Sequence, residues 1–139
     1  MENILSLKHC REKNKMVKEC IFLNTSGYLA EGSKSNLFLV RGGVIYTPSV
    51  ECGLLPGITR RRVMELLNRQ GIEVREGKYR VEELYESDEV FCTNSLMEVM
   101  PVVKVDEKVI GGGIPGPMTR RALFLYRESR KTLWHGCLE

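Results

Sequence analysis

The segment LFLVRGGVIY, residues 37–46, decides the fold because it predicts a β-hairpin. Its two apolar runs, residues 37–40 and 44–46, are rich in the branched and aromatic side chains that strands favour. Gly42 and Gly43 lie between the runs, and glycine readily takes the positive φ that a tight turn requires. We therefore expect an antiparallel pair of strands in the first third of the chain.

Other apolar segments on both sides of this hairpin predict further strands. Residues 20–23 and 89–93 have the continuous apolar character of buried strands. Residues 72–75 alternate between apolar and charged side chains, as a half-exposed strand does. A second hairpin is predicted over residues 99–110. The chain thus contains enough strand segments for a sheet of several strands.

Helices are predicted between these strands. Over residues 58–68 apolar side chains recur on one side, and Gly71 follows as a natural stop. A short helix is predicted over residues 81–86 and a longer one over residues 118–131, and Pro117 at its opening suits a first helical turn. Residues 2–18 carry a weak amphipathic pattern. Hairpins alternating with helices indicate a mixed α/β domain of the α+β kind, built around a twisted mixed sheet.

Composition and charge narrow the class of protein. The chain has 139 residues, of which 42% are hydrophobic and 28% charged, and this suits one globular domain. The net charge of +3 comes partly from Arg60-Arg61-Arg62 and Arg120-Arg121, which we interpret as solvated helical faces rather than a nucleic-acid surface. No apolar run approaches the roughly 20 residues that span a bilayer. Since the N-terminal residues also lack a signal-peptide core, we expect a cytoplasmic protein without membrane contact.

The cysteines do not predict a metal site or a disulfide framework. The five are scattered and form no C-x-x-C pair, and the sequence has only two histidines. We therefore expect no bound metal and reduced thiols. Cys92 lies in an apolar run and is expected in the core.

The helix start at residues 56–59 has the chemistry of an anion site. Gly57 lets the backbone approach a ligand closely. The amides of Ile58 and Thr59 lie at the helix N-terminus, where backbone donors have no acceptor within the helix. The Thr59 hydroxyl adds a donor, and the helix dipole favours negative charge. These groups suit a phosphate monoester, although an ordinary Pro-Gly helix start with Thr59 as a cap is the better explanation when the segment is taken alone.

Two other polar positions lie at predicted strand ends. Thr93-Asn94-Ser95 ends a strand and enters a turn whose amides and hydroxyl can face an anion. Glu31 lies between apolar residues and Gly32, where a carboxylate beside a core needs a partner. An ordinary turn and an exposed loop glutamate explain these two positions when each is considered singly.

The order of these segments resembles one family along most of the chain. EGSKSNLF (residues 31–38), LPGITR (55–60), TNSLMEVMP (93–101) and GPMTR (116–120) occur in the order found in class IV (fold-type IV) pyridoxal-phosphate aminotransferases. The resemblance covers about residues 20–126. It implies the D-amino-acid aminotransferase-like fold, a twisted mixed sheet or pseudo-barrel flanked by helices.

The resemblance also implies a division of the chain and a set of roles. Residues 1–18 would be the remnant of a helix or linker after an N-terminal domain, 19–132 the cofactor-binding C-terminal domain, and 133–139 a tail. The cofactor would be pyridoxal 5′-phosphate, and residues of the first three segments (31–38, 55–60 and 93–101) would contact it or the substrate. Glu31 would pair with the pyridine nitrogen, Leu55 would pack on the ring, Gly57, Ile58, Thr59 and Ser95 would hold the phosphate, and Asn94 and Leu96 would shape the substrate pocket. Asn36 would support the loop around Glu31.

The lysine that bonds the cofactor in this family has no clear counterpart. In the family it lies some thirty-odd residues before the glutamate, in a Lys-x-x-Asn context. Lys8 lies only 23 residues before Glu31 and lacks that asparagine. We expect that the lysine lies upstream of this chain and that the chain alone is inactive, with Lys8 as the alternative Schiff-base lysine.

The branch of the family is predicted from the turn after the strand at residues 89–93. Thr93-Asn94-Ser95-Leu96-Met97 is most similar to 4-amino-4-deoxychorismate lyases, with branched-chain and D-amino-acid aminotransferases as alternatives. The resemblance implies a small amino-acid or keto-acid substrate and a homodimer for the full-length form. A non-catalytic domain that binds phosphorylated ligands is the alternative from another class.

Overall fold

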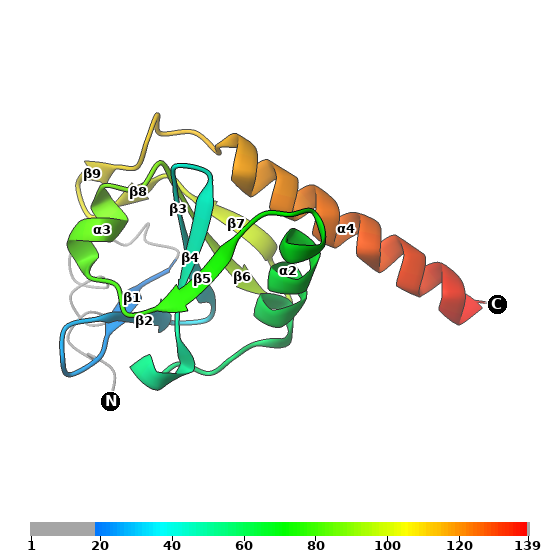
Figure 1. Ribbon diagram of the computed structural model, residues 1–139, viewed down its shortest axis with the longest axis horizontal. Helices are drawn as coiled ribbons and strands as arrows, with labels where there is room; N and C mark the ends of the chain where they lie inside the picture. The colour runs from blue at the N-terminus through cyan, green and yellow to red at the C-terminus, as the bar shows by residue number, and fades with distance from the viewer. Residues whose placement is uncertain (1–18, 139) are drawn as a thin grey trace.

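A five-stranded mixed sheet forms the centre of the protein, in the strand order β5-β4-β3-β6-β7 (Figure 1). The computed structural model describes residues 19–138, with side chains as far as residue 131. The elements, in chain order, are β1 Ile21–Leu23, β2 Leu29–Gly32, β3 Asn36–Arg41, β4 Val44–Pro48, the 3-10 helix η1 Val50–Cys52, α2 Ile58–Arg69, β5 Val74–Gly77, α3 Val81–Tyr85, β6 Glu89–Asn94, β7 Glu98–Val102, β8 Lys104–Val105, β9 Lys108–Val109 and α4 Pro117–Leu138.

The predicted hairpin is confirmed as β3 and β4. The two strands pair antiparallel, with Leu39 opposite Tyr46, and Gly42 and Gly43 take φ values of 57° and 79° in the turn. β6 pairs antiparallel with the other side of β3, while β5 pairs parallel with β4. The single parallel pair makes the sheet mixed, and β3 lies at its centre.

Both faces of the sheet are covered, and alternation along β3 assigns each side chain to a face. Phe38 and Val40 pack with Phe91 against α2 and α4, and the rings of Phe38 and Phe91 stack with centroids 4.8 Å apart. Leu37 and Leu39 point to the opposite face, into a cluster that includes Cys92 and Leu84. Figure 1 shows α2 and α4 on one side of the molecule, and α3, β1–β2 and β8–β9 on the other.

Hydrogen bonds to Glu89 of β6 hold the start of α4 against the sheet. Glu89 of β6 accepts hydrogen bonds from the Met118 amide (3.1 Å), the Thr119 amide (2.8 Å) and the Thr119 hydroxyl (2.8 Å) at the start of α4. A carboxylate at a helix N-terminus satisfies its free amides and complements its dipole. Gly116 leaves the room for it, because a Cβ there would overlap the Glu89 side chain.

Several elements differ from the predictions in extent. β5 begins two residues later than the predicted strand, and the predicted second hairpin is divided between β7, which pairs with β6, and the small β8–β9 hairpin. α4 continues to Leu138, through residues assigned to a tail. The predicted helix over residues 2–18 lies outside the described residues.

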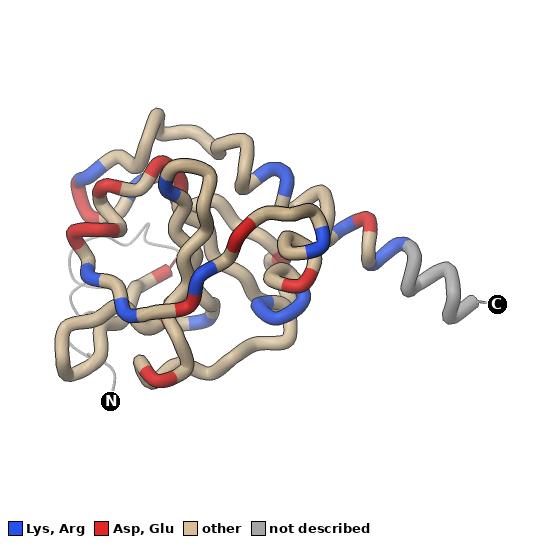
Figure 2. The backbone as a smooth tube through the Cα atoms, in the orientation of Figure 1, with Lys and Arg blue, Asp and Glu red and all other residues tan. Residues whose placement is uncertain are grey.

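The solvated-face prediction was wrong for one arginine. Figure 2 shows basic positions along α2 and α4, but Arg60 is buried, and its guanidinium lies 2.9 Å from the Glu76 carboxylate. Arg61, Arg120 and Arg121 are exposed as expected. No helix in the part of the chain that the structure describes is long and apolar enough to cross a bilayer.

Candidate functional site

The predicted site residues surround one edge of the sheet, where β3 begins and β6 ends. Asn36, the first residue of β3, lies opposite Thr93 in the β3–β6 register. Its side-chain amide donates to the Leu55 carbonyl (2.9 Å), and its side-chain oxygen accepts from the Gly57 amide (3.1 Å). Asn36 therefore joins this sheet edge to the loop that leads into α2, which is a supporting role of the kind that the resemblance implies.

Gly57 is required by this contact rather than by a ligand alone. A Cβ at position 57 would lie 2.8 Å from Asn36 Oδ1, closer than real Cβ contacts. Its backbone, at φ −73° and ψ 157°, is in an extended conformation that any residue adopts. The restriction to glycine therefore comes from packing against Asn36, a contact between residues 21 positions apart.

The N-terminus of α2 presents free donors at this edge. The first hydrogen bond of the helix runs from the Arg61 amide to the Gly57 carbonyl (3.2 Å). The amides of residues 58–60 come before it in the chain and therefore have no acceptor within the helix. Thr59 is buried, whereas the Ile58 side chain is 78% exposed. Free amides at the positive end of a helix dipole can bind an anion, so the phosphate contact expected at Ile58 and Thr59 stays a prediction.

Arg60 fixes the direction of this helix start. Its buried guanidinium donates to the Pro48 carbonyl (3.1 Å) at the end of β4 and to Glu76 (2.9 Å) in β5. A planar guanidinium can bridge two such acceptors at once. The local sequence does not indicate this role, because both partners of Arg60 are distant in the chain.

Glu31 lies beside the same loop. It is half-buried in β2, and its carboxylate accepts a hydrogen bond from the Leu55 amide (3.1 Å). Leu55 is thus held at its amide by Glu31 and at its carbonyl by Asn36, while its side chain is 79% exposed. The structure thus brings Glu31, Leu55 and the α2 N-terminus together.

Glu19 is a further supporting residue that the sequence analysis missed. Its carboxylate accepts hydrogen bonds from the Ser33 hydroxyl, the Ser35 hydroxyl (2.6 Å) and the Lys34 amide (3.2 Å). It therefore closes the loop that directly follows Glu31. A glutamate 14–16 residues before its partners leaves no local pattern from which to predict this role.

The turn after β6 forms the other side of the site. Asn94 Oδ1 accepts from the amides of Leu96 (3.0 Å) and Met97 (2.5 Å), and its Nδ2 donates to the Lys34 carbonyl (3.0 Å). The Asn94 side chain thus stabilises the turn and ties it to the loop after Glu31. Ser95 and Leu96 are exposed, Leu96 by 89%.

The hydrogen-bonding groups at this edge fit a phosphorylated pyridine ring. Backbone amides at the α2 N-terminus and a Ser95 turn suit the phosphate, and Glu31 suits a ring N–H. The Thr93 hydroxyl is buried beside Asn36, and no hydrogen-bond partner for it occurs among the described residues. The described residues include no cluster of three or more side chains that could hold a metal ion.

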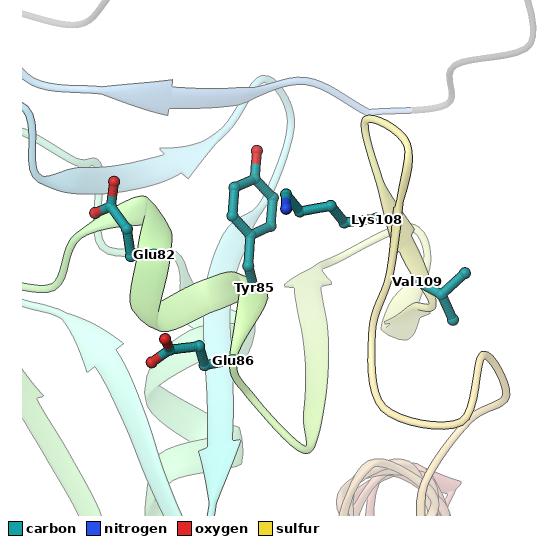
Figure 3. A pocket seen from close by; sticks show the side chains of 5 residues that line it. All are labelled: Glu82, Tyr85, Glu86, Lys108 and Val109. Atoms are coloured by element: carbon teal, nitrogen blue, oxygen red, sulfur yellow. The ribbon is translucent and has the colours of Figure 1, made fainter.

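A hollow of about 500 Å³ lies elsewhere, between α3 and the β8–β9 hairpin (Figure 3). Lys108 points toward the ring of Tyr85, with Nζ 5.2 Å from its centroid. Burial and the hydrogen bond to Asp106 (2.8 Å) raise the pKa of Tyr85 to about 12. None of the predicted site residues lines this hollow, so it is separate from the candidate site.

Comparison with known proteins identifies the family. A sequence model of amino-transferase class IV matches residues 1–105. A probable branched-chain-amino-acid aminotransferase of Aquifex aeolicus is 44% identical over 109 residues, covering 78% of this chain and 35% of the relative. An aminodeoxychorismate lyase of Bacillus subtilis is 40% identical over 117 residues, covering 84% and 40%. The chain therefore belongs to the class IV aminotransferase family.

The fold gives the same result. The branched-chain amino acid aminotransferase from Escherichia coli superposes with a TM-score of 0.79 at 40% identity, over 86% of this chain and 40% of that structure. Another branched-chain amino acid aminotransferase, solved in complex with N-(5′-phosphopyridoxyl)-L-glutamate, superposes with a TM-score of 0.81 at 38% identity, over 90% and 40%. The expected fold-type IV architecture is thus confirmed, and the family is pyridoxal-phosphate-dependent. This chain spans less than half the length of these relatives.

Proposed function

We propose that this chain is the cofactor-binding part of a pyridoxal-phosphate-dependent class IV enzyme. The observation that carries the proposal is the hydrogen-bonded chain from Glu31 through Leu55 and Asn36 to Gly57. It links a carboxylate to the N-terminus of a helix. A phosphorylated pyridine ring has one group for each end of this arrangement, the ring nitrogen and the phosphate.

Each residue has a defined task in this proposal. Glu31 holds the proton on the ring nitrogen, and the amides of Ile58 and Thr59, with the Thr59 hydroxyl, donate to the phosphate. Ser95 adds a phosphate contact from the opposite turn. The exposed Leu55 side chain covers one ring face and excludes water there. When bound, the cofactor supplies an electron sink for the substrate α-carbon.

We propose a lyase most similar to 4-amino-4-deoxychorismate lyase as the activity of the whole protein. The turn Asn94-Ser95-Leu96 and the 40% identity to the Bacillus subtilis enzyme support it. A branched-chain aminotransferase is the second candidate, supported by the 44% identity to the Aquifex aeolicus protein. The two differ in whether the bound amine belongs to a ring system or to an open-chain amino acid.

Binding of pyridoxamine 5′-phosphate to this chain, followed by fluorescence, tests the cofactor site without needing a Schiff base. Thr59→Val and Glu31→Gln should each weaken binding by about 10-fold or more. Thr59→Val removes a hydrogen bond to the phosphate, and Glu31→Gln removes the negative charge that pairs with the ring N–H. Hydrogen bonds to charged groups are worth about 1.5–3 kcal/mol. The matched controls Thr25→Val and Glu65→Gln, both at exposed positions, should bind as the wild type does. Affinities of the Thr59 and Glu31 variants within twofold of wild type would eliminate the proposed site.

Two further measurements address the lysine and the substrate. Borohydride reduction with pyridoxal phosphate, followed by mass spectrometry, should give no stoichiometric adduct on Lys8; such an adduct would identify Lys8 as the Schiff-base lysine.

Reduced phosphopyridoxyl adducts of leucine and of 4-aminocyclohexanecarboxylate separate the lyase from the aminotransferase activity. A lyase should prefer the cyclic adduct, and Leu96→Ala should reduce the preference; preference for the leucine adduct would favour the aminotransferase.

A further inference from the structure

Glu98 has a backbone conformation that is unusual for its residue type. It begins β7 with φ of 62°, in the left-handed region that favours glycine and asparagine. It lies opposite Asn94 in the β6–β7 register, so the two residues bound the turn at residues 95–97. Such conformations persist only where the surrounding contacts impose them.

Two arginines of α4 bind the Glu98 side chain. Arg127 Nε donates to one Glu98 oxygen (2.9 Å) and Arg130 Nη1 to the other (2.7 Å). The Glu98 side chain is only 17% exposed, although the arginines are more than half exposed. The hydrogen bond from Arg127 is the main cause that lowers the pKa of the Glu98 carboxyl below its usual value. Glu98 is thus an ionised anchor between β7 and α4.

Side-chain hydrogen bonds hold the turn that carries Ser95 at both of its ends, through Asn94 and through Glu98. At one end, Asn94 already uses Oδ1 for the amides of Leu96 and Met97 and Nδ2 for the Lys34 carbonyl. At the other end, Glu98 connects the turn to α4 through its hydrogen bonds with Arg127 and Arg130. A glycine at position 98 would take the same φ without strain but would lose the connection.

We propose that Glu98 is a positioning residue that holds the 95–97 turn, and hence Ser95, in place for the phosphate of the cofactor. This inference rests on the proposed function, because it assigns Ser95 to the phosphate. The Arg127 and Arg130 side chains act on the turn through Glu98. A rigid turn lowers the cost of ordering when the phosphate binds.

The test separates a positioning role from a general structural one. Affinities of the 139-residue chain for pyridoxamine 5′-phosphate and for pyridoxamine, which lacks the phosphate, are compared in Glu98→Gly, Glu98→Gln and Arg127→Gln/Arg130→Gln. Glu98→Gly and the double variant should bind the phosphorylated ligand about 3–10-fold more weakly, with the pyridoxamine affinity unchanged. Glu98→Gln keeps an acceptor and should recover part of the loss. Glu128→Gln, on the same helix, should match the wild type.

The outcomes distinguish this inference from the proposed function. If the wild type binds the phosphorylated ligand and Glu98→Gly leaves the ratio of the two affinities within twofold, the positioning role is overturned. If the wild type does not bind it, the proposed function fails. Amide hydrogen exchange at residues 95–97 of the free chain is an independent readout. Exchange should accelerate in Glu98→Gly, and unchanged exchange would also overturn the positioning role.

Discussion

The contact between Asn36 and Gly57 allows a quantitative test of how the site is built. Asn36→Ala removes hydrogen bonds of 2.9 and 3.1 Å to the Leu55 carbonyl and the Gly57 amide. At about 1 kcal/mol net for each bond, the free energy of unfolding should fall by about 2 kcal/mol. Gly57→Ala should cost about 1–3 kcal/mol, because its Cβ would lie 2.8 Å from Asn36 Oδ1.

The double variant distinguishes this explanation from independent effects. Once position 36 is alanine, the oxygen that clashes with the new Cβ at position 57 is gone, so Gly57→Ala should cost at least about 1 kcal/mol less than in the wild type. Gly42→Ala is the control, since its cost comes from φ of 57° with no atom near the new Cβ, and should be equal in both backgrounds. Urea unfolding followed by circular dichroism measures all the variants. A coupling below about 0.3 kcal/mol between positions 36 and 57 would refute the reasoning.

Three further predictions concern other polar groups. Glu89→Ala should lower the free energy of unfolding by about 1–2 kcal/mol in urea denaturation, because it removes the carboxylate that caps α4. The lowered pKa of Glu98 contributes stability that is present above its unfolded value near 4.5 and lost as the pH falls through the folded value. Glu98→Gln should therefore destabilise the protein more at pH 7 than at pH 3; an equal cost at both would contradict the ion pair with Arg127. Tyr85, with a pKa of about 12, should ionise above the usual 10 in an absorbance titration, and Asp106→Asn should lower that pKa.

The elements with a strong local pattern were predictable from the sequence. The β3–β4 hairpin, the α2 helix and the buried strand β6 follow from apolar runs, glycine turns and helical periodicity, which act over a few residues. The order of the motifs at residues 31–38, 55–60, 93–101 and 116–120 was also sufficient to recognise the family. The local pattern placed the start of β5 two residues too early. The bounds of this strand are set by its pairing with β4, which the local sequence does not show.

The polar contacts that hold the site could not be predicted in the same way. Glu19 with Ser35, Arg60 with Glu76 and Glu89 with Thr119 join residues 16–30 positions apart. Nothing in the local sequence of a charged residue shows whether the fold will bury it against a partner. Arg60 illustrates this, because its neighbours in the Arg60-Arg61-Arg62 run are less buried and the sequence pattern does not separate them.

The central claim is that the phosphate of pyridoxal phosphate binds at the α2 N-terminus, with Ser95 as a further contact. A titration of the ¹⁵N-labelled chain with pyridoxamine 5′-phosphate tests this most directly, because backbone amides report contacts one by one. We expect the amide signals of Ile58, Thr59 and Ser95 to shift together and to saturate with a single affinity. Shifts confined to the hollow lined by Tyr85 and Lys108, or no saturable shift at residues 58 and 59, would contradict the claim.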